Sequence, residues 1–191
     1  MNRLLIPIVL SLPCLAFAQD SSEPTLAASD LSYDYAQLRH VDLDEGNGDG
    51  LRFGGSHRLG DDWIALGEIT SYDLDGNVDR STLELGGGYV HGLDRNFDLI
   101  TTLSLIHTEI DRPFPFGDSD DSGIGMSLGT RGMLTPELEL RGSVRHVKLD
   151  DSDTFLELGG DYHFTERFSA GASTELAGDT DLFTIGARLH F

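Results

Sequence analysis

From residue 31 onward, apolar and polar positions alternate in short runs, and clusters of Gly, Asp, Asn and Pro separate these runs. A period of two residues is typical of β-strands, and the separating clusters are typical of turns. The pattern therefore predicts an all-β chain with ten strands. The expected strands are Leu31–Val41, Gly50–Leu59, Trp63–Tyr72, Ser81–His91, Phe97–Ile110, Ser122–Met133, Glu137–Lys148, Thr154–Phe164, Phe168–Ala177 and Leu182–Phe191.

Most of these strands have one face without charge and one face that carries charges. Leu83, Leu85, Gly87 and Tyr89 form one uncharged face, for example, and Glu84 lies between them on the other parity. The charged parity brings acids and bases together in nearly equal numbers. The residues expected to form a lumen charge network are Arg52, Glu68, Glu84, Arg131, Arg141, Arg145, Glu157, Glu175 and Arg188, and Arg58, Asp98, Glu139 and Asp161 share their parity.

Alternation alone fits two kinds of barrel. A soluble barrel buries its apolar parity and exposes its charges, whereas a membrane barrel reverses this arrangement. The aromatic residues favour the membrane barrel, because they share the apolar parity and lie near the short turns or the C-terminus, as a periplasmic girdle requires. These aromatics are Trp63, Tyr89, Phe97, Tyr162, Phe164, Phe168 and Phe191. In the first strand, Tyr33 and Tyr35 are expected to face outward, with Arg39 on the same parity near the outer end.

The connections between the expected strands alternate between short turns and longer loops rich in Asp. Outer-membrane barrels show this alternation, with the short turns on the periplasmic side. We therefore expect residues 31–191 to form a closed antiparallel up-and-down transmembrane β-barrel of ten strands, and eight strands remain the alternative.

The first residues of the chain resemble a secretory signal peptide. Arg3 supplies the positive charge, an apolar stretch follows, and Ala16 to Ala18 provide a small-x-small cleavage pattern. The apolar run is shorter than the ~20 residues that a membrane-spanning helix needs. We expect residues 1–18 to be the signal peptide and residues 19–30 to be a periplasmic N-terminal segment.

The composition excludes several functions. The chain holds 33 Asp and Glu against 13 Lys and Arg, so a nucleic-acid partner is not expected, since phosphate binding needs a basic patch. Its single cysteine, Cys14, falls in the expected signal peptide. The mature chain can therefore form neither a disulfide nor a cysteine-held metal site.

The last strand carries the clearest resemblance to a known family. Its apolar residues alternate up to a terminal Phe, at Phe183, Ile185, Leu189 and Phe191. This pattern resembles the C-terminal signature of Gram-negative outer-membrane barrels, and the chain as a whole resembles small OmpA/OmpX-like proteins. The resemblance implies location in the bacterial outer membrane, contact with its lipid and lipopolysaccharide, and recognition by the barrel-assembly machinery. Those relatives have eight strands.

Two Asp-rich loops are the candidate metal sites. Their Asp-x-Asp spacing with Asn and Gly resembles calcium-binding loops, although neither has the spacing of an EF-hand. The plain alternative is that Asp, Asn and Gly are solvated turn formers. The candidate ligands are Asp42, Asp44, Asn47, Asp49, Asp73, Asp75, Asn77 and Asp79.

Three function classes remain open. A surface-interaction barrel with acidic, cation-binding loops ranks first, and a narrow pore ranks second. An enzyme ranks third: omptin-type outer-membrane proteases also have ten strands and use Asp and His at the rim, where this chain has His40, His107 and His146. Since the omptin motifs are missing and fold alone does not establish chemistry, we expect no enzymatic activity and no cofactor. A monomer is expected.

Overall fold

The computed structural model describes residues 31–43, 48–74, 78–113, 117–177 and 180–191. Within these residues the chain forms ten strands and no helix. The strands are β1 (Tyr35–Leu43), β2 (Gly48–Arg58), β3 (Trp63–Leu74), β4 (Val78–Gly92), β5 (Phe97–Asp111), β6 (Ser119–Met133), β7 (Leu138–Lys148), β8 (Ser152–Thr165), β9 (Phe168–Ala177) and β10 (Thr180–His190). The expected signal peptide (1–18) and periplasmic segment (19–30) lie outside the described residues.

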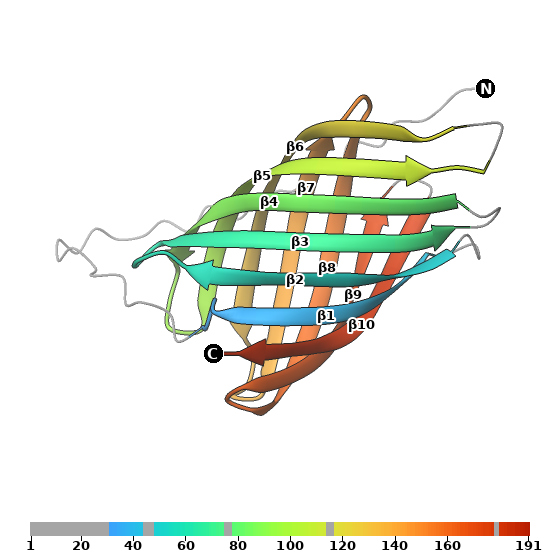
Figure 1. The fold of residues 1–191 in the computed structure, drawn as a ribbon. Coiled ribbons are helices and arrows are strands. Elements are labelled where there is room, and N and C mark those ends of the chain that lie inside the picture. Colours follow the sequence, from blue (N-terminus) through green and yellow to red (C-terminus); the bar gives the residue numbers. More distant parts are fainter. Residues whose placement is uncertain (1–30, 44–47, 75–77, 114–116, 178–179) are drawn as a thin grey trace, which may run out of the picture.

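The strands close into a barrel in which each strand pairs with its neighbours in the sequence and β1 also pairs with β10 (Figure 1). Tyr35 lies opposite His190 on one side and opposite Ser56 on the other. All pairs are antiparallel, so every strand has a partner on both edges and the ladder satisfies its own backbone groups. The prediction of a ten-stranded up-and-down barrel is confirmed, and the eight-stranded alternative is wrong.

The outer surface of the barrel is apolar. Leu103 on β5 is 59% exposed and Leu105 is 69% exposed. The opposite parity faces the lumen and carries buried charges such as Glu139 and Asp161. A lipid-facing charge costs about 2–4 kcal/mol at the middle of a bilayer, so this distribution suits a barrel surrounded by hydrocarbon.

Aromatic side chains gather near the short turns, as the sequence indicates. The rings of Trp63 on β3 and Tyr89 on β4 meet edge to face at 5.2 Å. Tyr162 and Phe164 on β8 meet at 5.0 Å. Between these two pairs, the ring of Phe97 lies over Gly132, where a Cβ would stand 2.1 Å from the ring.

The first strand differs from the prediction in two respects. It begins at Tyr35 rather than at Leu31, and Tyr33 and Tyr35 do not face outward. Tyr33 is 2% exposed inside the mouth of the barrel, and Tyr35 and Arg39 line the lumen. The physical reason is Arg39, because an inward parity gives its guanidinium a lumenal carboxylate as partner and keeps the charge out of lipid.

The Asp-rich ends of the strands also differ from the prediction. β2, β4, β6 and β8 begin two or three residues earlier than expected, so that Asp49 and Asp79 lie in strands and not in loops. Asp disfavours β-structure, but the ladder pairs backbone groups that a loop would leave to water. The loops on this side are therefore shorter than the sequence suggests.

Candidate functional site: the lumen of the barrel

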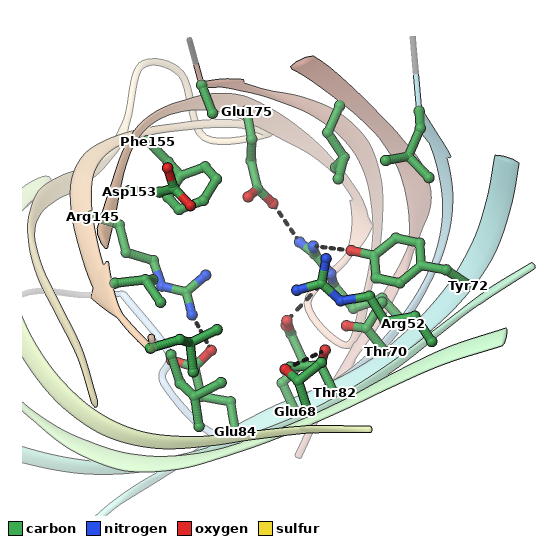
Figure 2. Close-up of a pocket in the computed structure, with 18 of the residues that line it drawn as sticks. Arg52, Glu68, Thr70, Tyr72, Thr82, Glu84, Arg145, Asp153, Phe155 and Glu175 are labelled. Carbon is green, nitrogen blue, oxygen red and sulfur yellow. Dashed lines mark hydrogen bonds and ion pairs between the residues drawn. The ribbon is translucent and has the colours of Figure 1, made fainter. Parts of the chain in front are cut away.

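A cavity of about 710 Å³ occupies the half of the lumen that lies toward the Asp-rich loops. We call it the vestibule. Its wall combines charged, hydroxyl and aromatic side chains, and Figure 2 shows them pointing inward from several strands. The residues labelled there are Arg52, Glu68, Thr70, Tyr72, Thr82, Glu84, Arg145, Asp153, Phe155 and Glu175.

Ion pairs cross the floor of the vestibule. Arg52 on β2 contacts Glu175 on β9 at 2.6 Å and Glu68 on β3 at 3.2 Å. On the other side of the lumen, Arg145 on β7 pairs with Glu84 on β4. Figure 2 shows these two groups standing apart, with Arg145 and Glu84 on the left and Arg52 on the right.

Carboxylates face each other in two of the ladders. Glu68 lies directly opposite Glu84 in the β3–β4 ladder, and Glu157 lies opposite Glu175 in the β8–β9 ladder. Like charges on neighbouring strands repel each other, and Glu84 and Glu175 take their cations, Arg145 and Arg52, from strands that are not adjacent to their own. The lumen therefore narrows where arginines such as Arg52 reach across it.

A second cavity of about 230 Å³ lies below this crossing. It shares Arg52, Glu68, Glu84, Arg145, Phe155 and Glu175 with the vestibule. Thr102 and Ser127 line one wall and are hydrogen-bonded to each other at 2.7 Å. The two cavities adjoin at the crossing ion pairs, so the lumen holds a second space beyond the vestibule.

A denser set of ion pairs, which we call the basal belt, closes one side of the lumen below the second cavity. It consists of Arg39, Arg131, Glu139, Arg141, Asp161 and Arg188. Arg131 donates two hydrogen bonds of 2.7 Å to Glu139, which also accepts one of 3.1 Å from Arg188. Asp161 is fully buried and pairs with Arg39 at 2.9 Å and with Arg141. Each carboxylate thus holds arginines from more than one strand.

Leu31 and Tyr33 fill the side of the mouth that the basal belt leaves open. Both side chains are buried, and they pack with Ile64 on β3 and Val90 on β4, against which Leu66, Ile100 and Met133 also pack. The Tyr33 hydroxyl donates a hydrogen bond of 2.7 Å to Asp98 on β5. Together with the belt, this segment closes the end of the barrel that carries the short turns.

All nine residues predicted to form the lumen charge network lie on the inner parity. Arg131, Arg141 and Arg188 belong to the basal belt, while Arg52, Glu68, Glu84, Arg145 and Glu175 surround the crossing. Glu157 accepts a hydrogen bond of 3.1 Å from Arg141. Arg39 and Tyr33 are lumenal residues that the alternation did not identify. The charge of Arg39 is the signal that could have assigned this parity of β1 to the lumen.

Four of the eight candidate metal ligands lie in described strands, where they stand side by side in the ladder. Asp42 lies opposite Asp49, Asp49 opposite Asp73, Asp73 opposite Asp79, and Asp79 opposite Asp111. They form one acidic row across five strands on the outer parity. Among the described residues, no group of three or more His, Cys, Asp or Glu is placed to hold a metal ion.

Side chains on the convex face of a barrel diverge, which explains why the acidic row does not converge on one point. The other candidates, Asp44, Asn47, Asp75 and Asn77, lie outside the described residues. The assignment of these loops as calcium sites therefore stays a prediction.

The rim histidines lie on the exposed outer side. His107 contacts Ser122 at 2.8 Å and Glu109 at 3.3 Å, and His146 contacts Thr154 at 3.0 Å. The contacts with Ser122 and Thr154 join neighbouring strands, the contact with Glu109 lies within β5, and neither histidine lines the vestibule. They give the omptin-like hypothesis no support from geometry.

The C-terminal residues expected to guide assembly are all exposed on the outer face. Phe183, Ile185 and Leu189 point outward from β10, and Phe191 follows it. Their recognition by the assembly machinery stays a prediction.

Comparison with known proteins supports the fold. No family model and no curated protein matches the chain. Among solved structures, the chain is similar to the KdgM porin, with 12% identity, a TM-score of 0.54, and coverage of 82% of this chain and 99% of the porin. A NanC porin matches with 9% identity, a TM-score of 0.52, and coverage of 82% of this chain and all of the porin. At these identities the similarity concerns the barrel fold, and the narrower resemblance to OmpA/OmpX-like proteins stays a prediction.

Proposed function

We propose that this chain is an outer-membrane β-barrel that acts as a narrow pore for small polar solutes. The observation that carries the proposal is the lumen, in which the vestibule of about 710 Å³ adjoins a second cavity of about 230 Å³. Small side chains such as Thr102 and Ser127 leave this space open. A barrel that served only as a surface scaffold would need no such space.

Location in the outer membrane is part of the proposal. Its support is the apolar exterior, the exposed aromatic pairs near the short turns, and the C-terminal alternation that ends in Phe191. A closed ladder leaves no edge strand to recruit a second copy, which favours a monomer. Contact with lipid and lipopolysaccharide and delivery by the barrel-assembly machinery follow from the same location.

From the sequence, surface interaction ranks first and a pore second, and the two cavities in the lumen favour the reverse order. Surface interaction remains the second candidate because of the acidic row. Asp42, Asp49, Asp73, Asp79 and Asp111 face outward side by side, and divalent cations screen such a row. No catalytic role is proposed.

Planar-bilayer recording of the refolded mature protein tests the pore. We expect small conductance steps in barrels whose folding is verified by their heat-modifiable migration on a detergent gel. Arg52→Ala removes the side chain that bridges Glu68 and Glu175, so it should enlarge the steps. The exterior variant Leu105→Ala is the matched control and should leave them unchanged. A flat trace from folded wild-type and Arg52→Ala barrels would contradict the pore and favour the second candidate.

A further inference from the structure

The mouth of the barrel is closed by two structures of different kinds. The basal belt is built from the strands themselves, on β1, β6, β7, β8 and β10. The other closure consists of Leu31, Ser32 and Tyr33, which precede β1 and belong to no strand. We call these three residues the plug.

The plug occupies an apolar pocket on the side of the lumen opposite the belt. Ile64 and Leu66 of β3, Val90 of β4, Ile100 of β5 and Met133 of β6 form this pocket from inward-facing positions. The vestibule wall also contains apolar side chains, among them Ile106 and Val147. The apolar side chains of the pocket differ, because they form the surface against which the side chains of Leu31 and Tyr33 pack.

Few polar contacts hold the plug. Its hydroxyl at Tyr33 donates to Asp98 at 2.7 Å, and its Ser32 carbonyl accepts a hydrogen bond of 2.8 Å from Arg131. The Tyr33 ring lies between two guanidinium groups, 4.9 Å from that of Arg58 and 4.8 Å from that of Arg131. Arg131 also donates hydrogen bonds to Glu139 in the basal belt. These bonds do not involve the plug, so displacement of the plug removes no partner from a belt carboxylate.

Asp34 anchors the plug to the rim. Its carboxylate accepts a hydrogen bond of 2.9 Å from the backbone N–H of Arg58 and contacts His57 at 2.7 Å, and its carbonyl accepts one of 3.1 Å from the N–H of Phe191. The hydrogen bond from Arg58 lowers the pKa of Asp34, so the carboxylate stays ionised near neutral pH. Arg58 contacts both parts, since its backbone N–H holds the anchor and its guanidinium lies over the ring of the plug.

We infer that the plug is a displaceable gate, which swings about Asp34 and opens the apolar side of the mouth while the basal belt stays in place. This inference rests on the proposed pore, whose regulation it describes. Leaving the mouth breaks no ladder hydrogen bond, because the plug makes no strand pair. Asp98 and Arg131 remain at the vacated place and supply polar groups that water can solvate.

A single thiol can report whether the plug covers the pocket. Val90 is buried beneath the plug, and the only cysteine of the chain is Cys14, so Val90→Cys places a unique thiol in the mature protein. In this background we expect a water-soluble maleimide to react slowly. Each net hydrogen bond changes an equilibrium roughly fivefold, so Leu31→Ala with Tyr33→Ala should speed the reaction by at least roughly tenfold.

Two further variants keep the test decisive. Tyr33→Phe retains the ring but loses the bond to Asp98, so it should give a rate between those of the other two proteins, even if the double variant fails to fold. Tyr89→Ala removes an outward-facing tyrosine and should leave the rate unchanged. Equal labelling in the wild-type background and in Tyr33→Phe would overturn the gate.

Bilayer recording of the same proteins separates the gate from the pore. We expect more frequent or larger channel openings from the double variant Leu31→Ala with Tyr33→Ala than from the wild type. If labelling rises but no folded variant conducts, the plug is displaceable and the proposed pore is wrong. If wild type and double variant conduct alike, the pore stands and the gate is wrong.

Discussion

Arg52 on β2 donates a hydrogen bond of 2.6 Å to Glu175 on β9, although β1 and β10 lie between these strands. The pair therefore joins two parts of the barrel wall that no ladder connects. Both side chains are largely buried, so the bond should contribute to stability as well as to the shape of the lumen.

A double-mutant cycle with Arg52→Ala and Glu175→Gln tests this coupling. Hydrogen bonds to charged groups contribute roughly 1.5–3 kcal/mol. Because Arg52 also contacts Glu68, it keeps an anionic partner when Glu175 is changed, so we expect a coupling energy near the lower end of this range. The measurement is denaturant unfolding of the barrel in bilayers. Coupling energy indistinguishable from zero would show that the two side chains do not pair.

Glu139 should be the most costly lumenal carboxylate to neutralise. It is 1% exposed and is contacted by Arg131, Arg188 and His163. Glu139→Gln leaves buried cations without their anion, which costs about 3–5 kcal/mol. The control is Glu109→Gln on the outer rim, which should change the free energy of unfolding by about 0.5 kcal/mol or less. Similar values for the two variants would contradict the buried belt.

The acidic row predicts a substitution that stabilises the barrel. Asp49 lies between Asp42 and Asp73 in the ladder, so Asp49→Ala should relieve repulsion and gain roughly 0.2–1 kcal/mol at low salt. Asp94→Ala should act in the opposite direction, because Asp94 accepts backbone hydrogen bonds from Asn96 and Phe97. Repulsion within the acidic row would be disproved if Asp49→Ala lowered the free energy of unfolding and added salt left the difference from the wild type unchanged.

Under the proposed pore, Arg145 should influence ion selectivity. Arg145→Ala leaves Glu84 without its partner where the two cavities adjoin and makes the passage more negative. Charged rings set selectivity in membrane pores, so reversal potentials should shift toward preference for cations. Arg167→Ala, in an exposed turn, serves as control. An unchanged reversal potential in conducting Arg145→Ala barrels would place the ion path elsewhere.

The barrel could be predicted from the sequence because, away from the strand ends, charge lies on one parity in most strands, as Leu83 to Tyr89 shows around Glu84. β1 is the exception. Tyr33, Tyr35 and Arg39 share one parity: the two aromatic rings favour placing it outward, whereas the charge of Arg39 favours placing it toward the lumen. The ion-pair partner that holds Arg39 in the lumen is Asp161, which lies 122 positions away on β8. Local alternation carries no information about such a contact.

The plug and the crossing ion pairs could not be predicted for the same reason. Leu31 and Tyr33 continue the alternation of β1, so nothing local shows that the ladder ends at Tyr35. The residues of the lumen charge network were identified by parity, whereas their pairing depends on strand register. Arg52, for example, reaches Glu175 only because the barrel closes through β1 and β10.

The central claim is that the apolar outer face is in contact with lipid, and paired substitutions test it most directly. Leu103 in the middle of β5 is 59% exposed, and Leu93 in the β4–β5 turn is 51% exposed. In bilayers, Leu103→Arg should lower the free energy of unfolding by about 2–4 kcal/mol, whereas Leu93→Arg should change it by about 0.5 kcal/mol or less. Equal, small effects of both substitutions, together with a barrel that stays folded and monomeric in water without detergent, would contradict the account.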